Sequence, residues 1–150
     1  MNIGFTGTRQ GMTQAQWHWT KREILALKLD YENTFHHGCC VGADEQAHRI
    51  VRDHIAKMGV WNWGIVLHPP QYTKHKALCL GEVAQWRPKP YLDRNRDIVN
   101  CSDILIAAPA GPEVRRSGTW STVRYARKCG KPIIIIYPDG RVEHENQKKD

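Results

Sequence analysis

The chain lacks several features that would assign it to a membrane or to a larger, multi-domain class of protein. No run of about 18 apolar residues occurs, so the sequence predicts no membrane span. Residues 1–5 enter a predicted strand without a basic segment followed by an apolar one, and we therefore expect no signal peptide and a cytoplasmic location. No internal repeat is present, and 150 residues are expected to fold as one domain.

Cysteine and histidine are present without the spacings of common disulfide or metal motifs. The five cysteines are an odd number without a C-x-x-C pair, which favours free thiols in a reducing compartment. None of the eight histidines pairs with a cysteine at zinc-finger spacing, and no H-E-x-x-H segment occurs. The sequence therefore predicts no metal site and no cofactor.

Positive charge exceeds negative charge. The formal net charge is +7, which favours phosphorylated or polyanionic partners through the overall field. A net positive charge also increases solubility, so by itself it does not distinguish a protein that binds phosphate from one that does not.

Short apolar segments alternate with segments of helical periodicity. The predicted strands are 2–5, 33–37, 64–68, 103–108 and 133–136. The predicted helices run from Thr13 to about Leu29, with an apolar stripe that includes Trp17, Ile24 and Leu25, and over 42–58, 91–101 and 118–129. Residues 69–90 contain four prolines and an isolated Trp86, and predict a long loop.

Continuously apolar strands that alternate with helices are typical of a parallel sheet covered on both faces. We predict an α/β fold: a single Rossmann-like three-layer domain over residues 1–137, with a parallel sheet of about five strands. Residues 138–150 are predicted to be a polar, frayed tail. Ligands of such sheets bind beyond the carboxyl ends of the strands, which brings the loops 6–11, 38–44 and 115–119 to one edge.

Each of these loops places glycine near the expected beginning of a helix. A helix N-terminus offers unpaired N–H groups and the positive end of a dipole, and glycine lets the backbone approach a ligand closely. The hydroxyls of Ser117 and Thr119 add donors. Any one loop is more simply an ordinary capped turn, but the three together favour a phosphate site.

Four segments resemble the SLOG superfamily, which includes the SMF/DprA and LOG ("Lonely guy") families. GCCVGADEQAH (38–48) is similar to their G-x-x-x-G-x-D-x-x-A-H segment, and RNRDIVNCSDILIAAP (94–109) resembles their R-N-R helix and the strand after it. SGTWST (117–122) resembles their glycine-threonine helix start, and GFTGTR (4–9) their opening. The likeness covers nearly all of residues 1–137, and the compact form looks closest to the small YpsA-like SLOG proteins.

The resemblance implies a nucleotide site and a homodimer or higher homo-oligomer. One arginine of SLOG enzymes contacts the substrate phosphate, and the matching position here is Arg94. Asp44 is expected to accept a ribose hydroxyl or to favour the helix dipole. The residues expected to bind the ligand are Gly7, Thr8, Arg9, Gly42, Asp44, Arg94, Asn95, Ser117, Gly118, Thr119 and Thr122.

One departure from the LOG pattern decides between binding and catalysis. LOG enzymes cleave nucleoside monophosphates between base and ribose 5′-phosphate, using the glutamate of P-G-G-x-G-T-x-x-E, and this position is Thr122 here. The departing base leaves positive charge on the glycosidic carbon, so the chemistry needs a carboxylate. Its loss favours a sensor or sequestering protein that binds a nucleoside phosphate or a nucleotide-derived small molecule. An N-glycosidase or phosphoribohydrolase stays open if Asp44 or Glu113 supplies a displaced acid.

A further alternative is DprA-like binding of single-stranded DNA. The spacing of residues 117–122 resembles the DprA pattern, and DprA performs no hydrolysis. The cations Arg124, Arg127, Lys128 and Lys131 recur on one helix face and can contact backbone phosphates, although a plain surface stripe has the same pattern. Trp86 can stack on a base from the loop 69–90.

Overall fold

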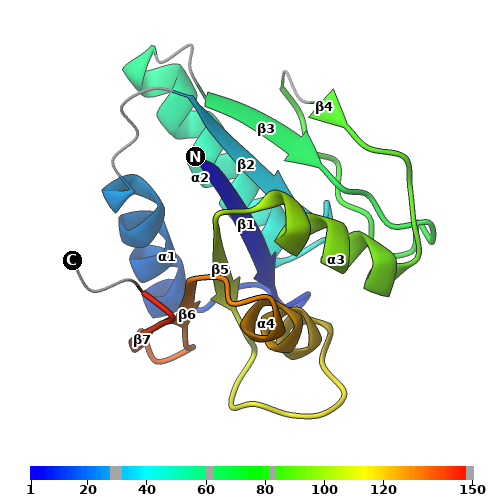
Figure 1. Ribbon diagram of the computed structural model, residues 1–150. Helices are drawn as coiled ribbons and strands as arrows, with labels where there is room; N and C mark the ends of the chain where they lie inside the picture. Colours follow the sequence, from blue (N-terminus) through cyan, green and yellow to red (C-terminus); the bar gives the residue numbers. More distant parts are fainter. Residues whose placement is uncertain (28–31, 60–62, 82–83, 148–150) are drawn as a thin grey trace.

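A computed structural model describes residues 1–27, 32–59, 63–81 and 84–147. Strands and helices follow one another as β1 (Asn2–Gly7), α1 (Gln14–Ala26), β2 (Asn33–His37), α2 (Ala43–Met58), β3 (Trp63–Leu67), β4 (Ala84–Gln85), α3 (Tyr91–Cys101), β5 (Ile104–Ala108), α4 (Gly118–Lys128), β6 (Ile133–Ile136) and β7 (Val142–Glu145) (Figure 1). No helix in these ranges is both long and apolar enough to cross a membrane.

The strands form one sheet in the order β4-β3-β2-β1-β5-β6-β7, in which only the β6–β7 pair is antiparallel. The chain moves outward from β1 to β3 and then returns to β5 on the other side of β1. The carboxyl ends of β1 and β5 therefore lie at a topological switch point, where such sheets bind ligands. The predicted α/β, Rossmann-like fold is confirmed, with α1 and α2 on one face and α3 and α4 on the other (Figure 1).

Within the described residues the sheet has seven strands, more than the predicted five or so. β4 lies in the segment 69–90, where Ala84 pairs with Val66 of β3. β7 lies in the predicted tail, where Val142 pairs with Ile136 of β6, so the prediction that this part is frayed was wrong. Both are short edge strands, and backbone pairing stabilises them without the apolar pattern of the inner strands. Residues 148–150 lie outside the described residues.

Apolar side chains form a separate core on each face of the sheet. Because side chains alternate along a strand, Ile104 and Ile106 enter the α1–α2 core, whereas Leu105 and Ala107 enter the α3–α4 core. Burial of each large aliphatic side chain stabilises the fold by about 1.5–3 kcal/mol. The inner strands are therefore rigid supports for the loops at their carboxyl ends.

Helix α1 differs from the predicted apolar stripe. It ends at Ala26, and Leu29 lies outside the described residues. Trp17 and Leu25 are exposed, and the buried face of α1 carries Ile24 and polar residues. One of these, Gln16, donates from its side-chain amide to two carbonyls at the ends of β5 and β6, both at 2.8 Å. Hydrogen bonds of Gln16 therefore hold α1 against the sheet, together with the apolar contact of Ile24 that the sequence predicted.

Candidate functional site

The carboxyl ends of β1 and β2 open onto a cavity of about 520 Å³. Its wall comes from the loops after these strands, from the start of α3, and from the segment 110–120 that leads into α4. The structure brings most of the predicted binding residues to this wall: Gly7, Thr8, Arg9, Asp44, Arg94, Asn95, Ser117, Gly118 and Thr119. Gly42 and Thr122 do not line it.

The loop after β1 is fixed on both sides. The N–H of Thr8 donates to the carbonyl of Ala108 at 2.9 Å, and the carbonyl of Thr8 accepts from the N–H of Ala43 at 2.9 Å. A Cβ at Gly7 would lie 2.5 Å from the Cβ of Ala43, so only glycine allows this approach. The loop is therefore held between the end of β5 and the beginning of α2.

The same loop packs against the N-terminus of α2. Gly42, its N-cap residue, has φ of 90°, and a Cβ there would lie 2.6 Å from the carbonyl oxygen of Thr8. The first free N–H of the helix, that of Ala43, is used by the loop after β1. Gly42 therefore permits a close backbone contact below the cavity.

The N-terminus of α4, in contrast, faces the cavity. The hydroxyl of Ser117 accepts from the N–H of Trp120 at 3.2 Å, which caps one donor. The N–H groups of Gly118 and Thr119 belong to the first turn, where a helix provides no partner, and both residues line the cavity. Donors and the positive end of the α4 dipole are therefore presented to a ligand.

Thr122 has a different environment from the one that the resemblance implies. It is 1% exposed, and its hydroxyl donates to the carbonyl of Gly118 at 2.8 Å inside α4. The hydroxyl is therefore occupied within the helix and lies away from the cavity wall.

Three arginines line the cavity, and they differ in exposure and in how many of their N–H donors are already hydrogen-bonded. Arg9 and Arg116 are exposed, so their guanidinium groups can turn toward a ligand. Arg94 is 5% exposed and donates to the carbonyls of Gly38 and His68, the latter at 3.0 Å. Arg94 therefore ties the ends of β2 and β3 together beneath the cavity, and most of its donors are already used.

Asp44 is the only acidic side chain among the described residues that line the cavity. It is 5% exposed, and it accepts from the N–H of Cys40 at 3.2 Å. Burial raises the pKa of Asp44 to about 6, against the opposing effects of Arg94 and of the backbone N–H donors. Asp44 can therefore exchange a proton near neutral pH.

Glu113, the other acid considered from the sequence, does not line the cavity. Its carboxylate accepts from Arg127 at 2.8 Å and from Arg124 at 3.1 Å, and these hydrogen bonds lower its pKa. Glu113 therefore stays ionised and is a poor proton donor. Two further members of the predicted stripe are also engaged, since Arg127 binds Glu145 and Lys131 donates to the carbonyl of Ser102, whereas Lys128 is exposed.

The segment 69–90 contributes His75 to the cavity wall but not Trp86. Trp86 is 40% exposed and packs against His68, with ring centroids 4.6 Å apart. Sequence reasoning also missed Tyr91, a lining residue whose ring lies against the guanidinium groups of Arg9 and Arg94. Its position at the first residue of the R-N-R helix, three residues before Arg94, was the available signal.

Comparisons with known proteins identify the fold. No protein-family model and no curated protein matches the chain. A structural genomics structure, TM1055, shares 14% identity over 88% of this chain and 71% of its own, with a TM-score of 0.58. The molybdenum cofactor binding protein from the phototrophic bacterium Rippkaea orientalis shares 24% identity over 91% of this chain and 76% of its own, with a TM-score of 0.60.

DNA processing protein A from Helicobacter pylori, which binds single-stranded DNA, is similar over 90% of this chain. The identity is 18%, the TM-score is 0.55, and the match covers 64% of that longer chain. Together the three structures show that this chain shares their α/β, Rossmann-like fold. Membership of the SLOG superfamily stays a prediction. The expected closeness to the YpsA-like branch stays a prediction.

Proposed function

We propose that the cavity binds a nucleoside phosphate or a nucleotide-derived small molecule, and that the protein acts as a sensor or sequestering protein. The observation that carries this proposal is the open N-terminus of α4, which faces the same cavity as Arg9 and Arg116. Backbone N–H groups at a helix start and guanidinium groups are complementary to phosphate oxygens.

Size and charge support a ligand of this kind. A cavity of about 520 Å³ falls in the usual range of small-molecule sites, which is about 300–1,000 Å³. Its cationic side chains outnumber the one carboxylate, and Tyr91 adds an aromatic surface near the phosphate-binding end. Two relatives with this fold bind a molybdenum cofactor and single-stranded DNA, which supports ligand binding at this fold's surface.

The test is a thermal-shift panel followed by calorimetry. The panel contains ribonucleoside and deoxyribonucleoside monophosphates, signalling dinucleotides and a single-stranded oligonucleotide. One small ligand should stabilise the protein by about 2.7 kcal/mol at a concentration of 100 Kd, and the others by much less. A preference for the oligonucleotide, with affinity that falls steeply as salt rises, would instead favour DNA binding.

Two arginines in one loop provide matched variants. Arg116 lines the cavity and Arg115 does not, although both are exposed and carry the same charge. We expect Arg116→Gln to lower the ligand affinity by about tenfold, which corresponds to about 1.4 kcal/mol of binding free energy. Arg115→Gln should change affinity by less than about twofold. Equal effects of the two variants, or no ligand in the panel, would overturn the proposal.

A second candidate function is hydrolysis of the N-glycosidic bond, because Asp44 lies in the cavity with a pKa of about 6. When protonated, its carboxyl group can donate to the departing base. When ionised, it can stabilise positive charge on the glycosidic carbon. Release of free base from a bound nucleotide should then disappear in Asp44→Asn and persist in Glu113→Gln. Tight binding without base release would reject this candidate and keep the first.

The superfamily resemblance also supports a homodimer. Light scattering during size-exclusion chromatography tests this part of the proposal, and a monomer at micromolar concentration would contradict it.

A further inference from the structure

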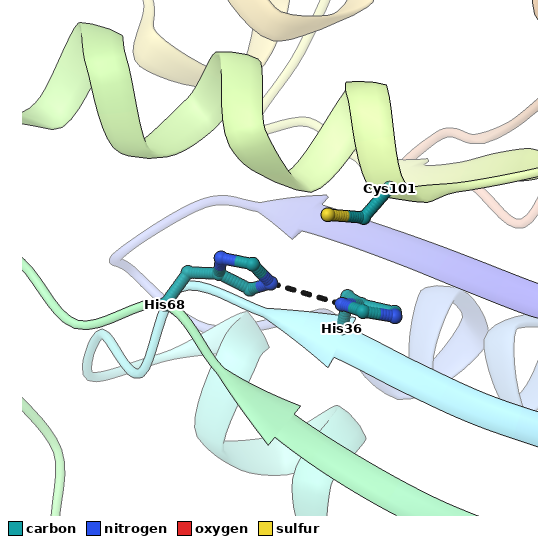
Figure 2. A group of neighbouring side chains, drawn as sticks. All are labelled: His36, His68 and Cys101. Atoms are coloured by element: carbon teal, nitrogen blue, oxygen red, sulfur yellow. Dashed lines mark hydrogen bonds between the residues drawn. The ribbon is translucent and has the colours of Figure 1, made fainter. Parts of the chain in front are cut away.

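Three potential metal ligands converge on the α3 face of the sheet, outside the cavity wall (Figure 2). His36 belongs to β2, His68 follows β3, and Cys101 is the last residue of α3. One ligand atom from each lies within 4.8 Å of the other two, and the three side chains point toward one another (Figure 2). These residues are far apart in the sequence, so no metal-binding spacing is visible there.

The ligand atoms of the group suit a cation. His36 is buried and His68 is 2% exposed. A neutral imidazole presents one nitrogen lone pair to a metal ion. Cys101 is a free, partly buried cysteine. Two neutral imidazoles and one thiol are a ligand set typical of Zn²⁺.

Hydrogen bonds orient one ring and leave the other loosely held. Nε2 of His36 lies 3.4 Å from Oδ1 of Asn2, so this nitrogen carries the proton and the lone pair of Nδ1 faces His68. Nδ1 of His36 lies 2.9 Å from Nε2 of His68. Within the described part of the chain, Nδ1 of His68 is buried and has no hydrogen-bond partner. The His68 ring is thus hydrogen-bonded at one nitrogen only.

A second cluster, His37, His48 and Cys79, has the same composition but a complete hydrogen-bond chain. The N–H of Cys39 donates to Nδ1 of His37 at 3.1 Å, so Nε2 of His37 carries the proton and donates to His48 at 2.9 Å. Nε2 of His48 then donates to the carbonyl of Leu80 at 2.8 Å. Every ring nitrogen is satisfied, and a cation would have to break this chain.

We propose that His36, His68 and Cys101 form a Zn²⁺ site, through Nδ1, Nε2 and Sγ respectively, with the fourth position open to water. Binding releases the thiol proton of Cys101 to solvent, because the thiolate is the ligand, and moves the proton of His68 from Nε2 to Nδ1. The Cys101 thiolate would carry one negative charge. Asp97, one turn before Cys101 on α3, adds another near His68 and Cys101, and its carboxylate is paired with Lys89 at 2.6 Å. The ion would join the end of α3 to β2 and β3.

Cobalt substitution tests the site in the whole chain of residues 1–150. After removal of metal by a chelator, Co²⁺ is titrated and the thiolate-to-cobalt charge-transfer absorption is recorded. We expect one Co²⁺ per chain, displaced by Zn²⁺, with the charge-transfer band lost in Cys101→Ser. Cys79→Ser is the matched control, because it removes the thiol of the second cluster, and it should keep the band.

Three outcomes would overturn the proposal: no band in the wild-type protein, a band that persists in Cys101→Ser, or a band lost in Cys79→Ser. Circular dichroism establishes whether the variants fold. If Cys101→Ser does not fold, zinc-edge X-ray absorption of the wild-type protein decides, because the site predicts one sulfur and two imidazoles around the ion. A shell without sulfur, or with more than one, contradicts it.

Discussion

Glycine is the N-cap of α2 and the first residue of α4, both beside the carboxyl edge of the sheet, yet only the glycine of α4 lines the cavity. At α2, the loop after β1 takes the N–H of Ala43 and packs against Gly42. At α4, no atom of the described residues lies within 4 Å of the position that a Cβ of Gly118 would occupy, apart from its chain neighbours and the backbone of its own helix turn. The glycine of α2 permits packing, whereas the glycine of α4 leaves space for a ligand.

This difference shows that a glycine at a helix start has two distinct physical roles. A positive φ and a close backbone neighbour require glycine for folding, as at Gly42. An ordinary φ and open space indicate a position where glycine matters only for what approaches from outside, as at Gly118. The following substitutions separate these roles.

The largest effect is expected for Gly42→Ala. A side chain at φ of 90° is strained, and the new Cβ would overlap the carbonyl of Thr8, so we expect a loss of about 3–5 kcal/mol in the free energy of unfolding. Urea denaturation measures it.

Gly118→Ala is the control for this prediction, and its unfolding free energy should change by less than about 0.5 kcal/mol. Similar losses in the two variants would mean that the two helix starts do not differ as described.

Asp44→Asn should stabilise the protein at neutral pH, because Asp44 is buried behind the start of α2. Its folded pKa of about 6 lies above the ordinary aspartate pKa of 3.8, so the stability that its neutral form contributes is present below about pH 4 and is lost as pH rises through 6. The Asn variant keeps the neutral form at every pH. We therefore expect it to exceed the wild type by about 1–3 kcal/mol above pH 6.

Denaturation series from pH 4 to pH 8 test this expectation. The difference between variant and wild type should grow between pH 4 and pH 6 and then stay constant. A difference that shrinks as pH rises would show that the charge attraction between Asp44 and Arg94 outweighs the cost of burying the carboxylate.

The sequence predicted the inner sheet well because its strands are continuously apolar. The segments 103–108 and 133–136 enter both cores, and this burial leaves a pattern in the residue types. The edge strands β4 and β7 leave no such pattern, since backbone pairing forms them. The face of α1 was predicted wrongly because Gln16 buries a polar group with its hydrogen bonds satisfied.

Only some positions of the candidate site could be predicted from the sequence, namely those that lie directly at the end of a strand or the beginning of a helix. Topology places Gly7, Asp44 and Gly118 at one edge, so their neighbourhood could be predicted. Backbone contacts between loops that are distant in the sequence decide which glycine faces the cavity. No sequence motif indicates these contacts. The His36–His68–Cys101 cluster has the same origin, because β2, β3 and α3 each supply one residue.

Ser117→Ala is expected to have a moderate effect. It removes the cap that accepts from the N–H of Trp120, and caps of this kind contribute about 1 kcal/mol. Because the hydroxyl also lines the cavity, ligand affinity should fall together with stability. Calorimetry at a temperature where the variant is fully folded separates the two losses. Unchanged affinity would place the ligand away from the start of α4.

Thr122→Val should have the smallest effect. It tests whether a residue of α4 that does not line the cavity leaves ligand affinity unchanged. Valine has nearly the shape of threonine, so the change removes the hydroxyl that donates to Gly118 and little else. A bond of this local kind contributes about 0.5 kcal/mol within a helix, and ligand affinity should change by less than about twofold. If affinity instead fell tenfold, the hydroxyl would have to leave Gly118 and reach the ligand. The first turn of α4 would then have to open on binding, which would make its N-terminus a moving part of the site.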